Sequence, residues 1–344
     1  MKDRSTPTDF ARCVTRFLTC YLPGERNLSS QTIRSYSLAL RMYISYLDSC
    51  AGIKPERIEL NDITADGIKG FLASIGDTRR ISPNTHNQRL SALKSFVRYA
   101  ILEYPAFIQD GQRVLAIPSM RSSTHEIVYL EKEAMKALLA VPDLTSVRGR
   151  RDLAMMAMLY DTGARIQELI GLQVKDVRLE KPETVTLLGK GRKMRTVPLM
   201  TETARIVKSY MRDQGFLEQS AFGNIQFFSS KNRAQFTRPG VAKILKKHFD
   251  VAKVVNPTIQ FPKSIHPHAI RASRAIHLLE SGVNIIAIRD FLGHASVTTT
   301  QVYLRVNNKA KHDAINSAYP SLTEAVPAWR ENVDLMTLLK ELCS

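Results

Sequence analysis

The first hundred residues carry a helical pattern of apolar and polar positions. Within residues 28–47, a hydroxyl-rich start is followed by apolar side chains at the spacing of one helix face: Ile33, Tyr36, Leu40, Tyr43 and Leu47. Residues 81–100 repeat this pattern, with Ser82 as an N-cap and Pro83 at the first helical position. A shorter helix is predicted over residues 63–74. The pattern therefore predicts a helical N-terminal domain.

The rest of the chain combines helices with a small amount of strand. Residues 131–139 and 149–160 predict helices, and the apolar run in the second indicates a buried core helix. Residues 183–199 predict two strands around a turn whose tip is Gly189-Lys190-Gly191. The polar stretch 118–125 between the two patterned regions predicts a linker. The expected fold class is mainly α with a small β-sheet, an α+β arrangement in the second domain.

Charge points to the kind of partner. Of the 344 residues, 49 are Lys or Arg and 32 are Asp or Glu, giving a net charge of +17. Such a balance favours a polyanionic partner, of which nucleic acid is the leading candidate. A hydrophobic content of 44% with only 16 Gly and 15 Pro indicates packed globular domains, and excludes a basic tail-type protein.

Other classes of protein are disfavoured by the same composition. No apolar run approaches the ~20 residues that cross a bilayer, and the first residues lack the apolar segment of a signal peptide. We therefore expect a cytoplasmic, nucleoid-associated protein without a membrane partner. The four cysteines show neither metal-ligand spacing nor a disulfide framework, so no zinc site is expected.

Basic side chains on the polar faces are candidates for contacts with a phosphate backbone. The alternative, that these charges belong to ordinary solvated faces, remains open for each helix. The candidates are Arg34, Arg41, Arg89, Lys94 and Arg98 in the first domain, and Arg192, Lys193, Arg233, Arg238 and Lys243 in the second.

Two motifs in the second domain place basic side chains at turns. After Gly163, Arg165 stands at the head of a new helix, with Glu168 on the same face one turn later, so the carboxylate can orient a phosphate-binding guanidinium. The alternative is a surface ion pair. Lys190 is displayed on the tip of the predicted hairpin, although a basic turn is common and this one does not match the phosphate-loop pattern.

The third motif is the segment 264–303. If Pro267 opens a helix, His268 and Arg271 project from the same face of its first turn. His294 follows the next predicted helix, and a second short element ends at Tyr303. Taken singly, His268 is more typical of a structural histidine and Tyr303 of a core aromatic. His266 lacks the spacing to Arg271, and His277 is predicted to be structural.

The order and flanks of Arg165, Lys190, His268, Arg271, His294 and Tyr303 resemble the signature of the tyrosine recombinase (phage integrase) family, in an Xer-like form. The resemblance runs from about residue 28 to residue 303. Residues 292–303 and 162–169 are closest to the family pattern. Ala272 departs from it, since that position often holds a second histidine, which affects a secondary position only.

The resemblance implies a mechanism that needs no metal, ATP or other cofactor. Tyr303 would attack a DNA phosphodiester to give a 3′-phosphotyrosine. Arg165 and Arg271 would bind the non-bridging oxygens, and Lys190 would protonate the departing 5′-oxygen. The remaining roles are support for this reaction: His268 accepts or relays the tyrosine proton, His294 donates to the phosphate, and Glu168 holds Arg165 or His268.

The resemblance also implies a domain organisation and an assembly. Residues 1–118 would form a core-binding DNA-binding domain, 119–126 a linker, 127–325 the catalytic domain and 326–344 a helical tail. The partners would be duplex DNA with specific recombination sites and further copies of the chain, as a dimer on each site and a tetramer around a Holliday junction. Leu335, Leu338, Leu339 and Leu342 give the tail an apolar stripe, which docks either on a neighbouring copy or on its own domain.

The expected biological role is integration, excision or transposition of a mobile element. The alternatives are chromosome-dimer resolution, a type IB topoisomerase-like activity and a non-catalytic DNA-binding protein. One local feature bears on regulation: residues 297–300 and Val302 are β-branched, which lowers helix propensity. We therefore expect the element that carries Tyr303 to be held loosely.

Overall fold

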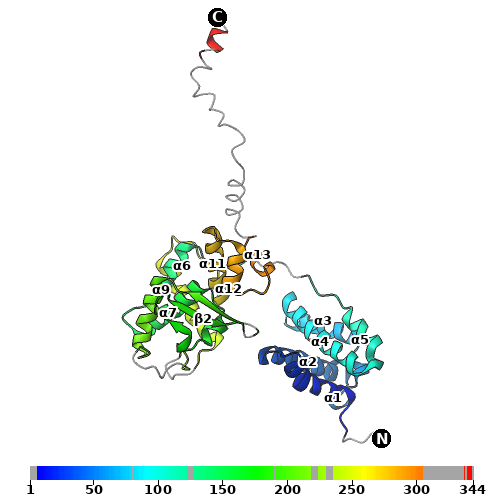
Figure 1. Ribbon diagram of the computed structural model, residues 1–344. Helices are drawn as coiled ribbons and strands as arrows, with labels where there is room; N and C mark the ends of the chain where they lie inside the picture. Colours follow the sequence, from blue (N-terminus) through cyan, green and yellow to red (C-terminus); the bar gives the residue numbers. More distant parts are fainter. Residues whose placement is uncertain are drawn as a thin grey trace. The chain divides into compact units, whose positions relative to one another are not determined.

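The computed structural model describes residues 6–79, 81–121, 127–189, 191, 193–217, 224–229, 235–304, 337 and 339–342. The chain divides into two compact units, Met1–His125 and Glu126–Ser344. Figure 1 shows that the first unit is helical and that the second combines helices with a small sheet. The expected fold class is confirmed.

Helices make up the N-terminal unit. The predicted helices correspond to α2 (Ser30–Ala51), α3 (Ala65–Arg79) and α4 (Pro83–Glu103). Ser82 caps α4 as expected, because its hydroxyl accepts from the Thr85 amide, and Pro83 occupies the first helical position. The hydrophobic pattern did not identify α1 (Asp9–Arg16), the π-helical turn η1 (Phe17–Glu25) or α5 (Ile108–Leu115). Short 3₁₀ turns occupy Pro55–Arg57, Leu60–Asp62 and Pro105–Phe107.

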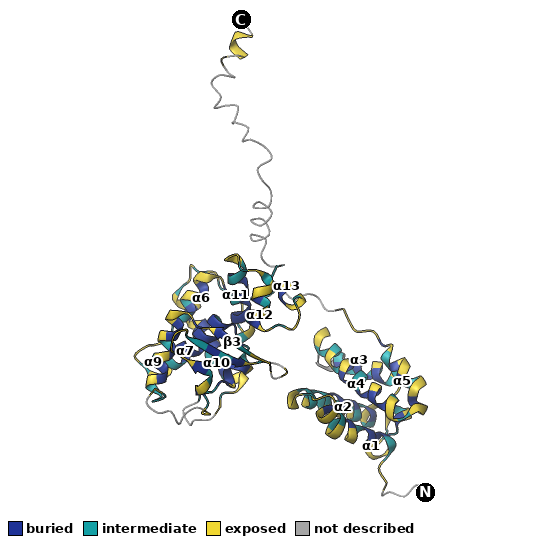
Figure 2. Cartoon of the chain, viewed as in Figure 1, coloured by how far each residue is buried: buried dark blue, intermediate teal, exposed yellow. Residues whose placement is uncertain are grey.

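Aromatic side chains fill the core of this unit. Phe17 is fully buried, with its ring centroid 5.5 Å from those of Phe96 and Tyr99. Figure 2 shows buried residues on the facing sides of the helices. Lys94 closes one end of the core, where its ammonium donates to the carbonyls of Leu115, at 2.7 Å, and Ile117. This ammonium thus satisfies the free carbonyls where α5 ends.

The second unit surrounds a long buried helix. Its helices are α6 (Lys132–Leu139), α7 (Val147–Thr162), α8 (Ile166–Ile170), α9 (Thr201–Asp213), α10 (Arg238–Val255), α11 (Pro267–Glu280), α12 (Ile285–Leu292) and α13 (Thr298–Leu304). The apolar run of α7 is buried from Leu153 to Leu159, which confirms its interpretation as core. His277 on α11 faces α7, with Nδ1 2.9 Å from the Tyr160 hydroxyl, so it is structural as predicted.

A three-stranded antiparallel sheet covers part of this core. Its order is β1 (Val177–Arg178), β2 (Thr184–Leu188) and β3 (Met194–Pro198). The predicted hairpin is confirmed, with Leu188 opposite Met194 next to the turn. The short β1, which follows the 3₁₀ turn Val174–Asp176, was not predicted. Lys190 and Arg192, which stand between these two strands in the sequence, lie outside the described residues.

Little of the proposed C-terminal tail falls within the described residues. Leu339 and Leu342 are exposed, whereas Leu335 and Leu338 lie outside the described part. None of the helices that the structure describes is long and apolar enough to cross a membrane.

Candidate active site

The first component of the site is the junction between α7 and α8. Gly163 adopts φ +57° at the end of α7, so the chain turns sharply and Arg165 becomes the N-cap of α8. The Arg165 amide donates to Glu168 Oε2 at 2.8 Å, and Nη1 donates to Oε1 at 2.7 Å. Because the Glu168 side chain is only 3% exposed, this pair is not the surface ion pair that the sequence left open.

A second arginine binds the same carboxylate. Arg195, on β3, donates from Nη1 to Glu168 Oε1 at 3.0 Å and from Nη2 to Oε2 at 2.7 Å. We did not identify Arg195 from the sequence. The sequence did contain a signal. Arg195 stands two residues before the buried Val197, so both side chains lie on the inward face of β3.

Glu168 is an ionised link between these two arginines. Burial raises the pKa of its carboxyl, but the hydrogen bonds from Arg195 and Arg165 together lower that pKa below its ordinary value. The carboxylate therefore carries its charge at neutral pH and holds both guanidinium groups in a fixed orientation.

Arg271 is the most deeply buried cation of the site. As predicted, Pro267 opens α11, and the capping group is the His266 side chain, whose Nδ1 accepts from the Ala269 amide. Arg271 is 2% exposed, and it donates to the Gly163 carbonyl at 2.5 Å and to the Leu292 carbonyl at 2.6 Å. Burial, and then the charge of Arg165, lower its pKa to about 10, so Arg271 remains protonated at neutral pH.

The end of α12 brings these arginines together. Arg195 Nε donates to the Phe291 carbonyl at 3.2 Å, Arg271 to that of Leu292, and Arg165 to that of Gly293 at 3.2 Å. The last carbonyls of a helix have no partner in the helix and carry its partial negative charge, so they stabilise cations. We call Arg165, Arg195, Arg271 and Glu168 the arginine cluster.

The nucleophile candidate lies within the electrostatic influence of this cluster. Tyr303 is half-buried on α13, and its ring stacks on that of His294 with centroids 6.4 Å apart. Burial raises the pKa of Tyr303, although the charges of Arg271 and Arg165 act in the opposite direction. The phenol is therefore protonated at neutral pH, and attack on phosphorus requires a group that accepts its proton.

Both histidines among the predicted catalytic residues are neutral at neutral pH. Burial, followed by the charges of Arg271 and Arg165, lowers the pKa of His294 to about 4. His268 lies at the exposed start of α11, where partial loss of water and the charge of Arg271 lower its pKa. A neutral imidazole carries one free lone pair, so His268 is able to accept a proton.

The remaining predicted residues fall into three groups. Lys190, Arg192 and Arg233 lie outside the described residues. Arg238 belongs near the site, since its Nε donates to Gln167 Oε1 at 2.7 Å beside Arg165, and its charge contributes to the lowered pKa of His268. The others have no such link to the site, and their contact with DNA stays a prediction: Arg34, Arg41, Arg98, Lys193 and Lys243 are exposed, Arg89 is half-buried and Lys94 caps α5.

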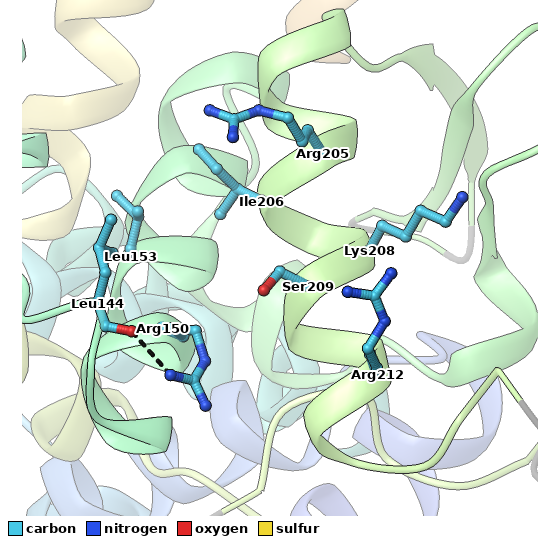
Figure 3. Close-up of a pocket in the computed structure, with 8 residues that line it drawn as sticks. All are labelled: Leu144, Arg150, Leu153, Arg205, Ile206, Lys208, Ser209 and Arg212. Atoms are coloured by element: carbon cyan, nitrogen blue, oxygen red, sulfur yellow. Dashed lines mark hydrogen bonds between the residues drawn. The ribbon is translucent and has the colours of Figure 1, made fainter.

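A basic pocket of 410 Å³ lies elsewhere in the second unit. Figure 3 shows Arg205, Lys208 and Arg212 projecting from α9, opposite Arg150 and Leu144. Arg150 is already bound to Asp213, with Nε 2.6 Å from Oδ2, so it joins α7 to α9. None of the predicted catalytic residues lines this pocket. No group of three or more metal-ligating side chains occurs among the described residues.

The arrangement suits an anion facing a protonated phenol. Arg165 and Arg271 each use two N–H groups in the hydrogen bonds above, and an arginine has five such donors. Glu168 balances one of the three positive charges. The net charge and the unused donors both favour a phosphate next to Tyr303.

Comparison with known proteins identifies relatives over both units. Residues 128–310 match the model of the phage integrase family, and residues 14–104 match that of the phage integrase N-terminal SAM-like domain. The chain is 33% identical over 304 residues to the putative integrase/recombinase y4rC of Sinorhizobium fredii, covering 87% of this chain and 88% of the relative.

One further relative and one solved structure are also similar to this chain. The chain is 30% identical over 302 residues to tyrosine recombinase XerD of Listeria monocytogenes, covering 87% of this chain and 96% of the relative. The Tn1549 transposon integrase, solved in complex with transposon right end DNA, matches with a TM-score of 0.67 at 16% identity, covering 89% of this chain and 99% of that one. At this identity the second match shows a shared fold.

Proposed function

Because this chain belongs to the phage integrase family, the tyrosine recombinases, we propose that it cleaves and rejoins duplex DNA through a covalent link between Tyr303 and a 3′-phosphate. One observation carries this proposal. Arg165 and Arg271 are more than a hundred residues apart in sequence, yet both donate to carbonyls at the end of α12. The ring of Tyr303 stacks on His294, which follows this helix end directly.

The arginine cluster is the phosphate-binding half of the reaction. Arg165 and Arg271 bind the two non-bridging oxygens of the scissile phosphate, and their fixed charges stabilise the pentavalent transition state. Glu168 and Arg195 hold Arg165 in the orientation that this requires. Hydrogen bonds within the protein hold these guanidinium groups in position before DNA binds, so they need little reorganisation during the reaction.

The proton balance of the reaction involves three side chains. Tyr303 Oη attacks phosphorus while neutral His268 accepts the phenolic proton, and the bond to the 5′-oxygen breaks. Lys190 protonates that oxygen as it leaves. Religation runs the same steps in reverse, with the 5′-hydroxyl of a DNA end as the nucleophile, so the energy of the phosphodiester is retained and no ATP or metal ion takes part.

A covalent-trapping experiment tests the activity. The protein is incubated with a library of nicked duplexes that carry a randomised recognition segment, and DNA that stays bound to protein in denaturant is recovered and sequenced. We expect a covalent complex that disappears in Tyr303→Phe while duplex binding to the recovered sequence persists. Absence of any denaturant-stable complex from the wild-type reaction would overturn the proposal of phosphotyrosine chemistry.

The same substrates separate the alternative activities. A recombinase joins strands from two duplexes into recombinant junctions, whereas a type IB topoisomerase-like enzyme only relaxes supercoiled DNA. Recombinant product on paired sites supports the first, and relaxation without exchange supports the second. Duplex binding without any covalent product supports a non-catalytic DNA-binding protein.

We propose integration, excision or transposition of a mobile element as the biological role, with chromosome-dimer resolution as the alternative. The similarity to an integrase/recombinase supports the first role, and the similarity to XerD supports the second. The recovered target sequence distinguishes them: a site at the ends of a mobile element supports integration, and a single chromosomal site supports dimer resolution.

We further propose that the chain acts as a dimer on each site and a tetramer in synapsis, with residues 326–344 docking on a neighbouring copy. Exposed Leu339 and Leu342 support a tail whose apolar side chains are available to a partner. Removal of residues from 329 onward is expected to abolish multimers on DNA while monomer binding remains. Unchanged assembly in size-exclusion chromatography with multi-angle light scattering would contradict docking in trans.

A further inference from the structure

Thr300 is the residue through which α13 is buried. It is 1% exposed, and it is the buried residue of the seven that form the helix. Its hydroxyl oxygen lies 2.8 Å from Nδ1 of His294. This hydroxyl has no other hydrogen-bond partner among the residues that the structure describes. The contact therefore joins the nucleophile helix to the histidine that precedes it.

The direction of this hydrogen bond decides what His294 presents to DNA. A neutral imidazole carries one N–H, so one ring nitrogen donates and the other accepts. If the Thr300 hydroxyl donates to Nδ1, the proton of His294 is on Nε2, where it can donate to a phosphate oxygen. If Nδ1 donates instead, Nε2 presents a lone pair, which repels an anion.

Burial selects between these two arrangements. When Nδ1 donates to Oγ1, the Thr300 hydroxyl proton has no acceptor among the described residues, and a buried donor without a partner is unfavourable. When Thr300 donates, its proton and the Nδ1 lone pair are both satisfied. The geometry therefore favours Thr300 as the donor and Nε2–H as the tautomer.

We infer that Thr300 is a positioning residue: its hydroxyl fixes His294 as the Nε2–H tautomer, so that this histidine donates to the scissile phosphate only while α13 is docked. The inference rests on the proposed function, because it assigns His294 to the phosphate that Tyr303 attacks.

Docking of α13 then delivers two groups at once. Thr300 and Tyr303 stand one helical turn apart on the same element, and the Tyr303 ring stacks on His294. Withdrawal of α13 removes the nucleophile. It also breaks the Thr300–His294 hydrogen bond, so the Nε2–H tautomer of His294 is no longer fixed. An undocked subunit is thus deprived of both its nucleophile and one donor to the transition state.

Three substitutions test the role in cleavage of the nicked duplex. Thr300→Val keeps the shape and removes the donor, and we expect a loss of roughly 10-fold, typical of a lost hydrogen bond between neutral groups. Thr300→Ser keeps a hydroxyl and is expected to stay within about 3-fold of wild type. Thr299→Val, the exposed neighbour on the same helix, controls for the side-chain change and is expected to leave the rate unchanged.

A spectroscopic readout separates tautomer control from simple packing. In the full chain labelled with ¹⁵N-histidine, we expect the His294 Nδ1 resonance in the range of an unprotonated ring nitrogen at neutral pH, with Nε2 protonated. The resonance is assigned by its loss in His294→Gln. Thr300→Val should move both nitrogens toward the average of the two tautomers, whereas Thr299→Val should not.

The failure of this inference is distinguishable from failure of the proposed function. A wild-type protein that forms the covalent complex, with Thr300→Val equally active or with Nδ1 protonated in the spectrum, overturns the role of Thr300 and leaves the recombinase proposal standing. Equal loss in Thr300→Val and Thr300→Ser also overturns it, because a packing defect would then explain both. A wild-type protein without any covalent complex overturns the proposed function itself.

Discussion

The arginine cluster and the helix that carries Tyr303 hold their side chains by different means. Arg165, Arg195 and Arg271 are each fixed by hydrogen bonds to a carboxylate or to backbone carbonyls, and Arg271 is almost fully buried. α13 is seven residues long, rich in β-branched side chains, and buries Thr300 alone. Its helix propensity is therefore low.

This difference separates binding of the phosphate from attack on it. A preformed cluster keeps its geometry whether or not DNA is bound, because breaking it would leave buried charges and carbonyls without partners. A short helix with one buried side chain can leave its position at small cost. The comparison predicts strong effects on rate and stability within the cluster and weak, bidirectional effects at the exposed positions of α13, as distinct from Thr300 and Tyr303.

The largest expected effect is at Arg271. In Arg271→Lys, a single ammonium cannot reach the Gly163 and Leu292 carbonyls and also contact phosphate in the planar geometry of a guanidinium. We expect the single-turnover cleavage rate to fall by roughly 100- to 1,000-fold, as for loss of a transition-state donor. Arg274→Lys, on the same helix and paired with Asp161, is the control and should change the rate by less than about 3-fold. Equal losses in the two variants would contradict a specific role for Arg271.

The substitution Glu168→Gln tests the rigidity of the arginine cluster through its effect on the free energy of unfolding. Removing the buried charge that holds two arginines should lower the free energy of unfolding by about 2–4 kcal/mol at pH 7, measured by urea denaturation. The folded-state pKa of Glu168 is depressed, so its contribution is present above the ordinary value of 4.5 and is lost as the pH falls through the depressed value. The difference from wild type should therefore shrink in acid.

The matched control for that substitution is Glu202→Gln. Glu202 forms an exposed pair with Arg205 at the same i,i+3 spacing, and screening by water makes such a pair nearly neutral for stability. An equal loss in both variants would mean that the arginine cluster is no more rigid than a surface pair.

The pH dependence of cleavage tests the proton acceptor. The pKa of His268 is lowered from 6.5, so the unprotonated form persists to pH values below 6.5 and is lost as the pH falls further. Below its pKa the rate should fall about ten-fold per pH unit. His268→Gln should be slower at neutral pH and should lack this acid limb.

His266→Asn provides the control for the pH profile. Asn retains the N-cap that His266 supplies to α11, and this variant should keep the acid limb. An acid limb that vanishes in His266→Asn and persists in His268→Gln would contradict the role of His268 as the proton acceptor.

The smallest effect is expected on the exposed face of α13. Thr299 is exposed, and Thr299→Ala raises helix propensity by about 0.5 kcal/mol. If the helix is only partly docked in the absence of a neighbouring copy, cleavage should become about two-fold faster. A slower rate, measured under single-turnover conditions, would contradict the view that docking limits the reaction.

Local signals in the sequence determined much of the fold. Ser82 and Pro83 mark the start of α4, and Pro267 marks that of α11, because caps and prolines act through neighbouring residues. The hairpin of β2 and β3 forms on either side of Gly189 and Gly191, as the turn glycines predicted. The elements without a strong periodic pattern were not found, among them the π-helical turn Phe17–Glu25 and the two-residue strand β1.

The sequence also supplied the candidate catalytic residues, since a resemblance needs only their order and flanks. It did not supply Arg195, Thr300 as the partner of His294, or the carbonyls of Phe291, Leu292 and Gly293. Arg195 and Phe291 are 96 residues apart, and Arg271 and Gly163 are 108 apart. Side-chain type and local spacing determine which element forms, whereas the partners of a buried charge depend on which distant elements pack together, and that was decided by the tertiary structure alone.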